Sequence, residues 1–499
     1  MNKWGSWIFL VILIAAIGLQ LTGAWQKSFW VDEAYTADVV QRNMADIGKK
    51  AAEDVHPPLF IFVLALWGRI FGYTELGLRS LSIIFVALSI ILTYVLTRDI
   101  LGQEVGLIAT GLLAFSPLFL LFGNNARYYA MATVFGLLVT WSMVRYLQSK
   151  RLVFLLLYIL ACTSFLYLLF AAVIFIAGCN VWWLIQWIRE KRPITTHHLY
   201  WLLSQFIILG LYIPGFKMAI SVAGRFAEVV SLPNIVVELV KRTVYFSFVF
   251  SLGETLSPVN PLALLGIIAV AIAAGAALIL NRRKKNFWLP VIIVLLVGFS
   301  NILLTVFTAV SQNWQNLPYR ALYLLPFLMM WFGAGLAALK RKFALVLSVL
   351  IALAYCAGLM NYFSGEQFLR PIFTVPWRTI FSQIQSKIQP GGLVICDGND
   401  WACGYYAARY GFDRKMPSSW STTSQPQILD VWWIKTNLSV EISDNKGKVE
   451  ILGQIRQSYP ESDTYNYAPL DPSIRWLKGK LFHQQDFEYR VNVFRFYNP

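Results

Sequence analysis

Long apolar runs fill the first two thirds of the chain, and short polar segments separate them. A helix needs about 20 apolar residues to cross the ~30 Å hydrocarbon layer of a bilayer. Runs of suitable length lie at 6–24, 77–97, 105–122, 128–147, twice within 152–188, and at 199–214, 262–280, 287–310, 321–338 and 343–363. The pattern predicts an all-α polytopic membrane protein with about 11–13 transmembrane helices.

Whether the run at 59–71 crosses the membrane decides on which side all later loops lie. It is short for a crossing and carries Arg69, so it either crosses the membrane alone or is interfacial or re-entrant. If it does not cross, the later basic loops fall on the same side as Lys3, which the excess of Lys and Arg in cytoplasmic loops favours. If it crosses, these loops face outward. We predict a cytoplasmic N-terminus and outer loops at 25–58 and 215–260.

From about residue 364 the apolar runs give way to a mixed pattern. It predicts a helix, a Pro-Gly-Gly turn, a buried strand from Leu393 to Cys396, another helix, and strands at ILDVWWIK and FEYRVNVFRFY. We therefore predict a transmembrane domain at 1–363 and a small extracytoplasmic α/β domain at 364–499. This tail contains neither GxGxxG nor GxxxxGK, the motifs of nucleotide-binding loops. Cys396 and Cys403 either pair, if the tail meets an oxidising compartment, or stay free.

Composition and charge narrow the function classes. The chain is 57% hydrophobic and only 14% charged, which excludes a protein that is soluble throughout. Its net charge is +16, but the basic residues form short clusters between apolar runs rather than a stripe interleaved with aromatic residues. We therefore expect a membrane lipid environment and no nucleic-acid partner.

Six of the 26 acidic residues lie between Phe29 and Leu59, directly after the first span. Asp32 and Glu33 follow that span by about eight residues, and aromatic residues flank Asp32. A carboxylate among aromatic side chains at an interface is partly desolvated, which suits it to general-base chemistry or to binding a cation. For the other four acids, a solvated loop is the simpler interpretation; they are Asp38, Asp46, Glu53 and Asp54.

Histidine and arginine residues mark further outer positions. In His56-Pro57-Pro58-Leu59 the two prolines fix the backbone, so His56 is either a capping group or a ligand held where the chain re-enters the apolar phase. Arginines stand at the outer ends of three spans: Arg79, Arg127 (beside Tyr128) and Arg320. Each alone is compatible with a snorkelling side chain. Together, their guanidinium groups suit a lipid-linked phosphate.

The order of five motifs supports a family resemblance. VDEAY, HPPL, LGLRS, SPLFLLFGNNARYYA and YRALYLLPF follow one another along residues 1–340. In this order they resemble the bacterial membrane glycosyltransferases of the protein-mannosyltransferase and aminoarabinose-transferase type, which have the GT-C fold. The resemblance implies a GT-C-like fold and transfer of a sugar, with inversion, from a polyprenyl-phosphate donor to an acceptor hydroxyl on the outer face of the bacterial plasma membrane.

The resemblance also assigns roles to individual residues. It implies that Asp32 takes the proton of the acceptor and that Glu33 is its partner acid. The expected substrate-binding residues are His56, Arg79, Arg127, Tyr128 and Arg320. Some relatives carry an acidic metal ligand just before the prolines, where Val55 precedes His56 in this chain, although Asp54 is one position earlier. We therefore expect no metal ligands and no cofactor, although a divalent metal is not excluded.

Two other functions are compatible with the pattern. A lipid or polysaccharide transporter of the flippase kind would bind lipid phosphates without chemistry, but transporters place ionisable residues at mid-membrane, and these spans are nearly free of charge. A glycan ligase or polymerase on the same scaffold is also compatible. The sequence does not identify the acceptor, which is a lipid, a glycan or a protein.

Overall fold

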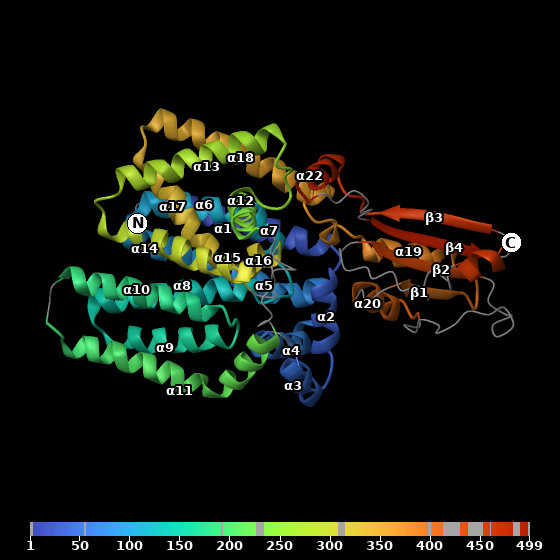
Figure 1. Cartoon of the computed structure of the whole chain (residues 1–499), viewed down its shortest axis with the longest axis horizontal. Coiled ribbons are helices and arrows are strands. Elements are labelled where there is room, and N and C mark those ends of the chain that lie inside the picture. The colour runs from blue at the N-terminus through green and yellow to red at the C-terminus, as the bar shows by residue number, and fades with distance from the viewer. Residues whose placement is uncertain are drawn as a thin grey trace. The chain divides into compact units, whose positions relative to one another are not determined.

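The computed structural model describes residues 3–53, 56–190, 193–225, 234–307, 315–397, 401–412, 430–437, 453–459, 461–482 and 490–497 of the 499-residue chain (Figure 1). The chain forms two compact units. The membrane unit comprises Met1–Trp25, Val40–Gly253 and Pro258–Leu359. The tail unit comprises Gln26–Val39, Glu254–Ser257 and Met360–Pro499. Two short segments that precede residue 258 therefore pack with the C-terminal residues.

The membrane unit is helical. Its helices are α1 (Lys3–Gln26), α3 (Met44–Glu53), α4 (Leu59–Phe71), α5 (Glu75–Leu101), α6 (Gln103–Ala114), α7 (Pro117–Gly123), α8 (Tyr129–Ser149), α9 (Leu152–Leu166), α10 (Ala172–Glu190), α11 (Thr196–Arg225), α12 (Ile235–Leu252), α13 (Pro261–Leu280), η1 (Lys285–Phe287), α14 (Trp288–Ile292), the π-helical η2 (Ile293–Val297), α15 (Gly298–Phe307), α16 (Leu317–Arg320), η4 (Leu322–Leu324), α17 (Leu325–Ala338) and α18 (Arg341–Ser364). The last turn of α18 belongs to the tail unit.

Eight helical stretches in the described residues are long and apolar enough to cross a membrane, and the bent pair α6 and α7 would make a ninth. Three more apolar helices are shorter: Leu59–Phe71, Leu152–Leu166 and Leu322–Ala338. At ~1.5 Å per residue, the 13 residues of α4 extend only ~20 Å, so α4 is too short to span ~30 Å alone. Each predicted span overlaps helical residues, but 105–122 is broken into α6 and α7, which are bent by 60°, and 308–310 of the span 287–310 lie outside the described residues. The predicted fold class is confirmed.

The segment 215–260, predicted to connect two spans on the outer face, is largely helical. Helix α11 continues to Arg225 through Pro214, and α12 occupies Ile235–Leu252. The charged residues of α12 hid this helix in the apolar pattern, but they pair with one another. Arg242 is buried, forms an ion pair with Glu238 at 3.1 Å, and also donates to the carbonyl oxygen of Thr305. Pairing one turn apart lets a helix bury one charged side chain beside an opposite charge.

Close helix packing in the membrane unit depends on small residues. Helix α17 packs against α6 and α13. A Cβ atom on Gly335 would collide with the backbone of Ala273 in α13, and one on Gly333 would lie 3.1 Å from the backbone nitrogen of Ala109 in α6. Glycine is therefore required for this close approach at Gly335.

The tail unit holds a four-stranded mixed sheet with helices. Its elements are α2 (Val31–Val40), η5 (Pro371–Phe373), α19 (Trp377–Lys387), β1 (Leu393–Asp397), α20 (Trp401–Arg409), β2 (Asp430–Asn437), β3 (Glu461–Tyr467), α22 (Pro472–Phe482) and β4 (Arg490–Tyr497). The strand order is β1-β2-β4-β3, with β1 parallel to β2 and the other pairs antiparallel. The three predicted strands are β1, β2 and β4. The sequence ESDTYNY of β3 is polar because this edge strand is largely exposed, which explains why the apolar pattern missed it.

On one face of the sheet, Ile395, Val431, Trp433 and Phe496 form an apolar core together with Ile455, which lies outside the strands. A disulfide joins Cys396 at the end of β1 to Cys403 in α20, with their Cα atoms 6.0 Å apart. The sequence had left this pairing open. The bond fixes α20 to the sheet, because it links a cysteine of β1 covalently to a cysteine of α20 seven positions later in the sequence.

Candidate active site

The candidate base Asp32 lies in the first turn of α2, within the tail unit. Its neighbour Glu33 is completely buried, with 0% of its surface exposed. A carboxylate oxygen of Glu33 accepts the backbone N–H of Trp30 at 3.5 Å, the bond that a residue at the third helical position makes in a capping box. Asp32 is only half-buried. Glu33 therefore shapes the start of the helix, while Asp32 keeps contact with solvent.

Aromatic residues from the far end of the chain hold this helix start. The backbone N–H of Phe29 donates to the hydroxyl of Tyr406 in α20 at 2.8 Å, across 377 residues of sequence. The ring of Trp30 packs edge-on against Phe373 at 4.9 Å, and Tyr35 packs against Trp401 at 5.1 Å. These contacts could not be predicted from the sequence, because no periodicity relates residues so far apart. The C-terminal tail thus provides the packing around Asp32.

A buried ion pair supports the same region. Glu254 is completely buried and accepts two hydrogen bonds of 2.8 Å from the guanidinium of Arg370. The guanidinium lies 4.7 Å from the ring of Phe373, the residue that packs on Trp30. Burial and the charge of Arg370 lower the pKa of Lys478 to about 8, against the attraction of Glu254. The tail unit therefore contains a charge network close to the aromatic residues that hold α2.

The membrane unit holds the candidate phosphate-binding residues. The segment between α7 and α8 carries Arg127, and neighbouring helices fix it: the amide of Asn124 donates to the carbonyl oxygen of Gln20 in α1 at 3.3 Å, and Ser82 in α5 donates to the carbonyl oxygen of Asn125 at 2.6 Å. Arg127 itself is only 6% exposed, and its guanidinium lies 5.9 Å from the ring of Tyr128. A buried amide and a buried hydroxyl thus hold the segment that carries this arginine at the start of α8.

His56 lies beside this segment. Its ring is 5.1 Å from that of Tyr128. Burial lowers the pKa of His56 well below its usual 6.5, and the positive charges of Arg127 and then Arg320 lower it further. The Arg320 segment is brought close by its neighbour Tyr319, whose ring lies 5.1 Å from that of Tyr129. The structure therefore gathers four of the five predicted substrate-binding residues in one region: His56, Arg127, Tyr128 and Arg320.

Arg79, the fifth predicted substrate-binding residue, forms a hydrogen bond with the protein backbone. It is buried near the start of α5 and donates to the carbonyl oxygen of Ala24, near the end of α1, at 3.0 Å. A buried guanidinium bonded to the last turn of a helix satisfies a carbonyl that has no partner within the helix. Its proposed contact with substrate stays a prediction.

The described residues contain no group of three His, Cys, Asp or Glu side chains that could hold a metal ion. Val55 occupies the position where some relatives carry an acidic metal ligand, Asp54 directly precedes it, and both lie outside the described residues. The absence of metal ligands therefore stays a prediction.

The lowered pKa of His56 predicts a pH dependence of stability. The folded protein binds fewer protons at this site than the unfolded chain does between the lowered pKa and 6.5, so stability should fall as the pH falls below 6.5. Replacing His56 with glutamine should make this decline shallower. Thermal unfolding of both proteins between neutral and acidic pH measures the difference, and parallel curves would contradict the burial of His56 beside two arginines.

Part of the chain matches a known family. Residues 55–215 match the model of the dolichyl-phosphate-mannose-protein mannosyltransferases. This region contains His56, Arg79, Arg127 and Tyr128. A curated relative, an uncharacterized protein of Aquifex aeolicus (strain VF5), is 30% identical over 145 residues, which are 27% of this chain and 28% of the relative.

Solved structures match over nearly the whole chain. ArnT from Cupriavidus metallidurans in the apo state has a TM-score of 0.55 at 12% identity, with 98% of each chain covered. The same protein bound to undecaprenyl phosphate gives 0.54 at 13% identity, also with 98% of each chain covered. The oligosaccharyltransferase AglB from Archaeoglobus fulgidus, in complex with an inhibitory peptide and a dolichol-phosphate, gives 0.51 at 9% identity and covers 99% of this chain and 88% of that one. In fold and in the matched segment, the chain thus resembles the polytopic membrane glycosyltransferases of the protein-mannosyltransferase and aminoarabinose-transferase type.

Proposed function

We propose that this protein transfers a sugar from a polyprenyl-phosphate donor to an acceptor hydroxyl on the outer face of the membrane. The observation that carries the proposal is the convergence of His56, Arg127 and Arg320, in which two guanidinium groups lie close enough to lower the pKa of one histidine. A site that holds two positive charges near a neutral imidazole is electrostatically prepared for an anion. The solved ArnT and AglB complexes contain undecaprenyl phosphate and dolichol-phosphate, which supports a lipid-linked phosphate as that anion.

In the proposed reaction, the arginines stabilise the departing phosphate. Arg127 and Arg320 supply fixed positive charge where negative charge develops as the bond between the sugar and the phosphate oxygen breaks. Without substrate, the lowered pKa of His56 favours its neutral form. The approach of a phosphate would favour the protonated form of His56 and raise its pKa again.

Asp32 is the proposed base. As the acceptor oxygen attacks the anomeric carbon from the side opposite the phosphate, its proton passes to the carboxylate of Asp32, and polyprenyl phosphate leaves with the bonding electron pair. This single displacement inverts the anomeric centre. Glu33 keeps the first turn of α2 in shape through its bond to Trp30. We further propose that Arg79 and Tyr128 border the substrate, that the N-terminus is cytoplasmic, and that no step requires a metal.

The proposal is tested with purified protein in lipid vesicles and a panel of polyprenyl-phosphate sugars. One donor of the panel should be consumed, and free polyprenyl phosphate should appear in equal amount. Arg127→Gln should raise the KM for this donor, because the hydrogen bond of a guanidinium to a phosphate contributes about 1.5–3 kcal/mol. The variant Arg341→Gln, at the start of α18, serves as a control. Movement of a labelled lipid across the bilayer without consumption of any donor would favour a transporter instead.

A further inference from the structure

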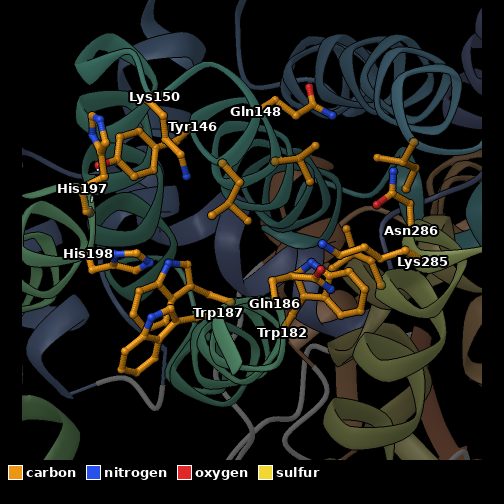
Figure 2. A pocket seen from close by; sticks show the side chains of 15 residues that line it. Tyr146, Gln148, Lys150, Trp182, Gln186, Trp187, His197, His198, Lys285 and Asn286 are labelled. Carbon is orange, nitrogen blue, oxygen red and sulfur yellow. Dashed lines mark hydrogen bonds between the residues drawn. The ribbon is translucent and has the colours of Figure 1, made fainter. Parts of the chain in front are cut away.

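A second polar site lies in the membrane unit, at the ends of the helices opposite to Arg127. Helix α8 runs from Tyr129, next to Arg127, to Ser149, which is ~31 Å at ~1.5 Å per residue. At its far end a cavity of about 180 Å³ opens among α8, α10, the start of α11 and η1 (Figure 2). The cavity is therefore separated from the proposed transfer site by about the thickness of the hydrocarbon layer.

The cavity wall favours an anion. Its 15 lining residues include two lysines and two histidines but no carboxylate: Lys150, Lys285, His197 and His198. Figure 2 shows Lys150 and His197 on one side of the cavity and Lys285 with Gln186 on another. The Nδ1 atom of His198 accepts the backbone N–H of Thr195 at 3.0 Å, which leaves the ring proton on Nε2. Every charged side chain in this wall is therefore a cation.

Gln186 is the observation that points to a ligand. Its side chain is only 6% exposed, and neither its Nε2 nor its Oε1 atom has a hydrogen-bond partner among the described residues. The Nδ1 atom of His197 likewise has none there. A buried amide without partners is unfavourable unless a bound group satisfies it. Phosphate oxygens would accept its N–H groups and those of the lysines.

Aromatic residues indicate where this anion comes from. Trp182, Trp183 and Trp187 line the cavity, and tryptophan is enriched at the headgroup level of membranes. Next to them, α10 and α11 expose large apolar side chains suited to acyl chains: Leu184, Ile188, Leu199 and Leu202. We propose that the cavity binds the phosphate-bearing headgroup of an anionic membrane lipid, in the leaflet opposite to the transfer site.

Lys150 offers a variant that removes charge without harming the fold. It ends α8 in the left-handed conformation, with φ 56°, where glycine is preferred. Lys150→Gly should therefore keep or raise thermal stability and still lower lipid affinity about fivefold, the effect of one basic residue at an anionic surface. Lys285→Gln should act similarly on affinity. Its neighbour Lys284 does not line the cavity, so Lys284→Gln is the matched control.

The experiment titrates delipidated protein in detergent with phosphatidylglycerol, phosphatidylcholine or glycerol 3-phosphate and follows binding by native mass spectrometry. We expect phosphatidylglycerol to bind more tightly than phosphatidylcholine, and Gln186→Leu to weaken this preference without lowering the stability of the lipid-free protein. Equal binding of both lipids, or an equal loss in Lys284→Gln and Lys285→Gln, would overturn the proposal. Glycerol 3-phosphate that binds as tightly as the lipid, with the same loss in Lys150→Gly, would overturn the lipid as the source and leave a soluble phosphate in its place.

Discussion

Replacing Asp32 with asparagine is expected to lower kcat about 10²–10⁴-fold, the usual contribution of a positioned general base. Asparagine has nearly the same shape but cannot accept the proton of the acceptor hydroxyl. The KM for the donor should change little, because the proposed contacts with the phosphate come from Arg127 and Arg320. Consumption of the donor identified with the panel of polyprenyl-phosphate sugars measures both constants.

Asp38 provides the matched control for this prediction. It is a second half-buried aspartate in the same helix α2, six residues after Asp32. Asp38→Asn should keep most of the activity, and both variants should unfold at the temperature of the parent. Undiminished turnover in Asp32→Asn, or an equal loss in both variants, would exclude Asp32 as the base.

Replacing Glu254 with glutamine is expected to destabilise the tail unit by about 3–5 kcal/mol. Glu254 is completely buried and is the ion-pair partner of Arg370, so the substitution would leave the charge of Arg370 unpaired. Removing one partner of a buried ion pair lowers stability by about this amount. The double variant Glu254→Leu with Arg370→Met should recover most of the loss, since an apolar pair needs no desolvation of charge. Thermal unfolding in detergent, followed by tryptophan fluorescence, measures these differences.

An exposed ion pair provides the control for the predicted effect of Glu254→Gln on stability. Lys49 and Asp46 lie 3.9 Å apart, with 77% and 47% of their side chains exposed. Asp46→Asn should change stability by less than about 1 kcal/mol, because water screens such pairs. If Glu254→Gln were as mild as Asp46→Asn, the buried pair would not stabilise the tail.

The membrane part of the fold could be predicted from the sequence because the bilayer imposes one rule on every span. Each apolar run had to be a helix, and short segments such as HPPL and NNARYYA had to lie at its ends. The rule failed where charges pair inside a helix, as Glu238 and Arg242 do in α12. In the tail unit, where this rule does not apply, the apolar pattern missed β3, whose polar residues face solvent on an edge strand.

The candidate site could be predicted only in part. Motif order indicated the individual residues, and the structure brings His56, Arg127 and Arg320 into one electrostatic group. Motif order could not indicate that Phe29 forms a hydrogen bond with Tyr406, or that Glu254 pairs with Arg370, since such contacts depend on folding of the whole chain. The unpartnered amide of Gln186 was equally hidden, because a glutamine in an apolar run gives no sign of what surrounds it.

The bond between Phe29 and Tyr406 also has a consequence for biosynthesis. The segment around Asp32 leaves the ribosome early, but Tyr406 follows it 377 residues later. At ~5–20 residues per second, this separation corresponds to roughly 20 to 75 seconds of translation. During that time the helices of the membrane unit can insert, while α2 lacks the aromatic partners that hold its first turn. The proposed base is therefore assembled only near the end of synthesis, so a nascent or truncated chain should carry a membrane unit without a working active site.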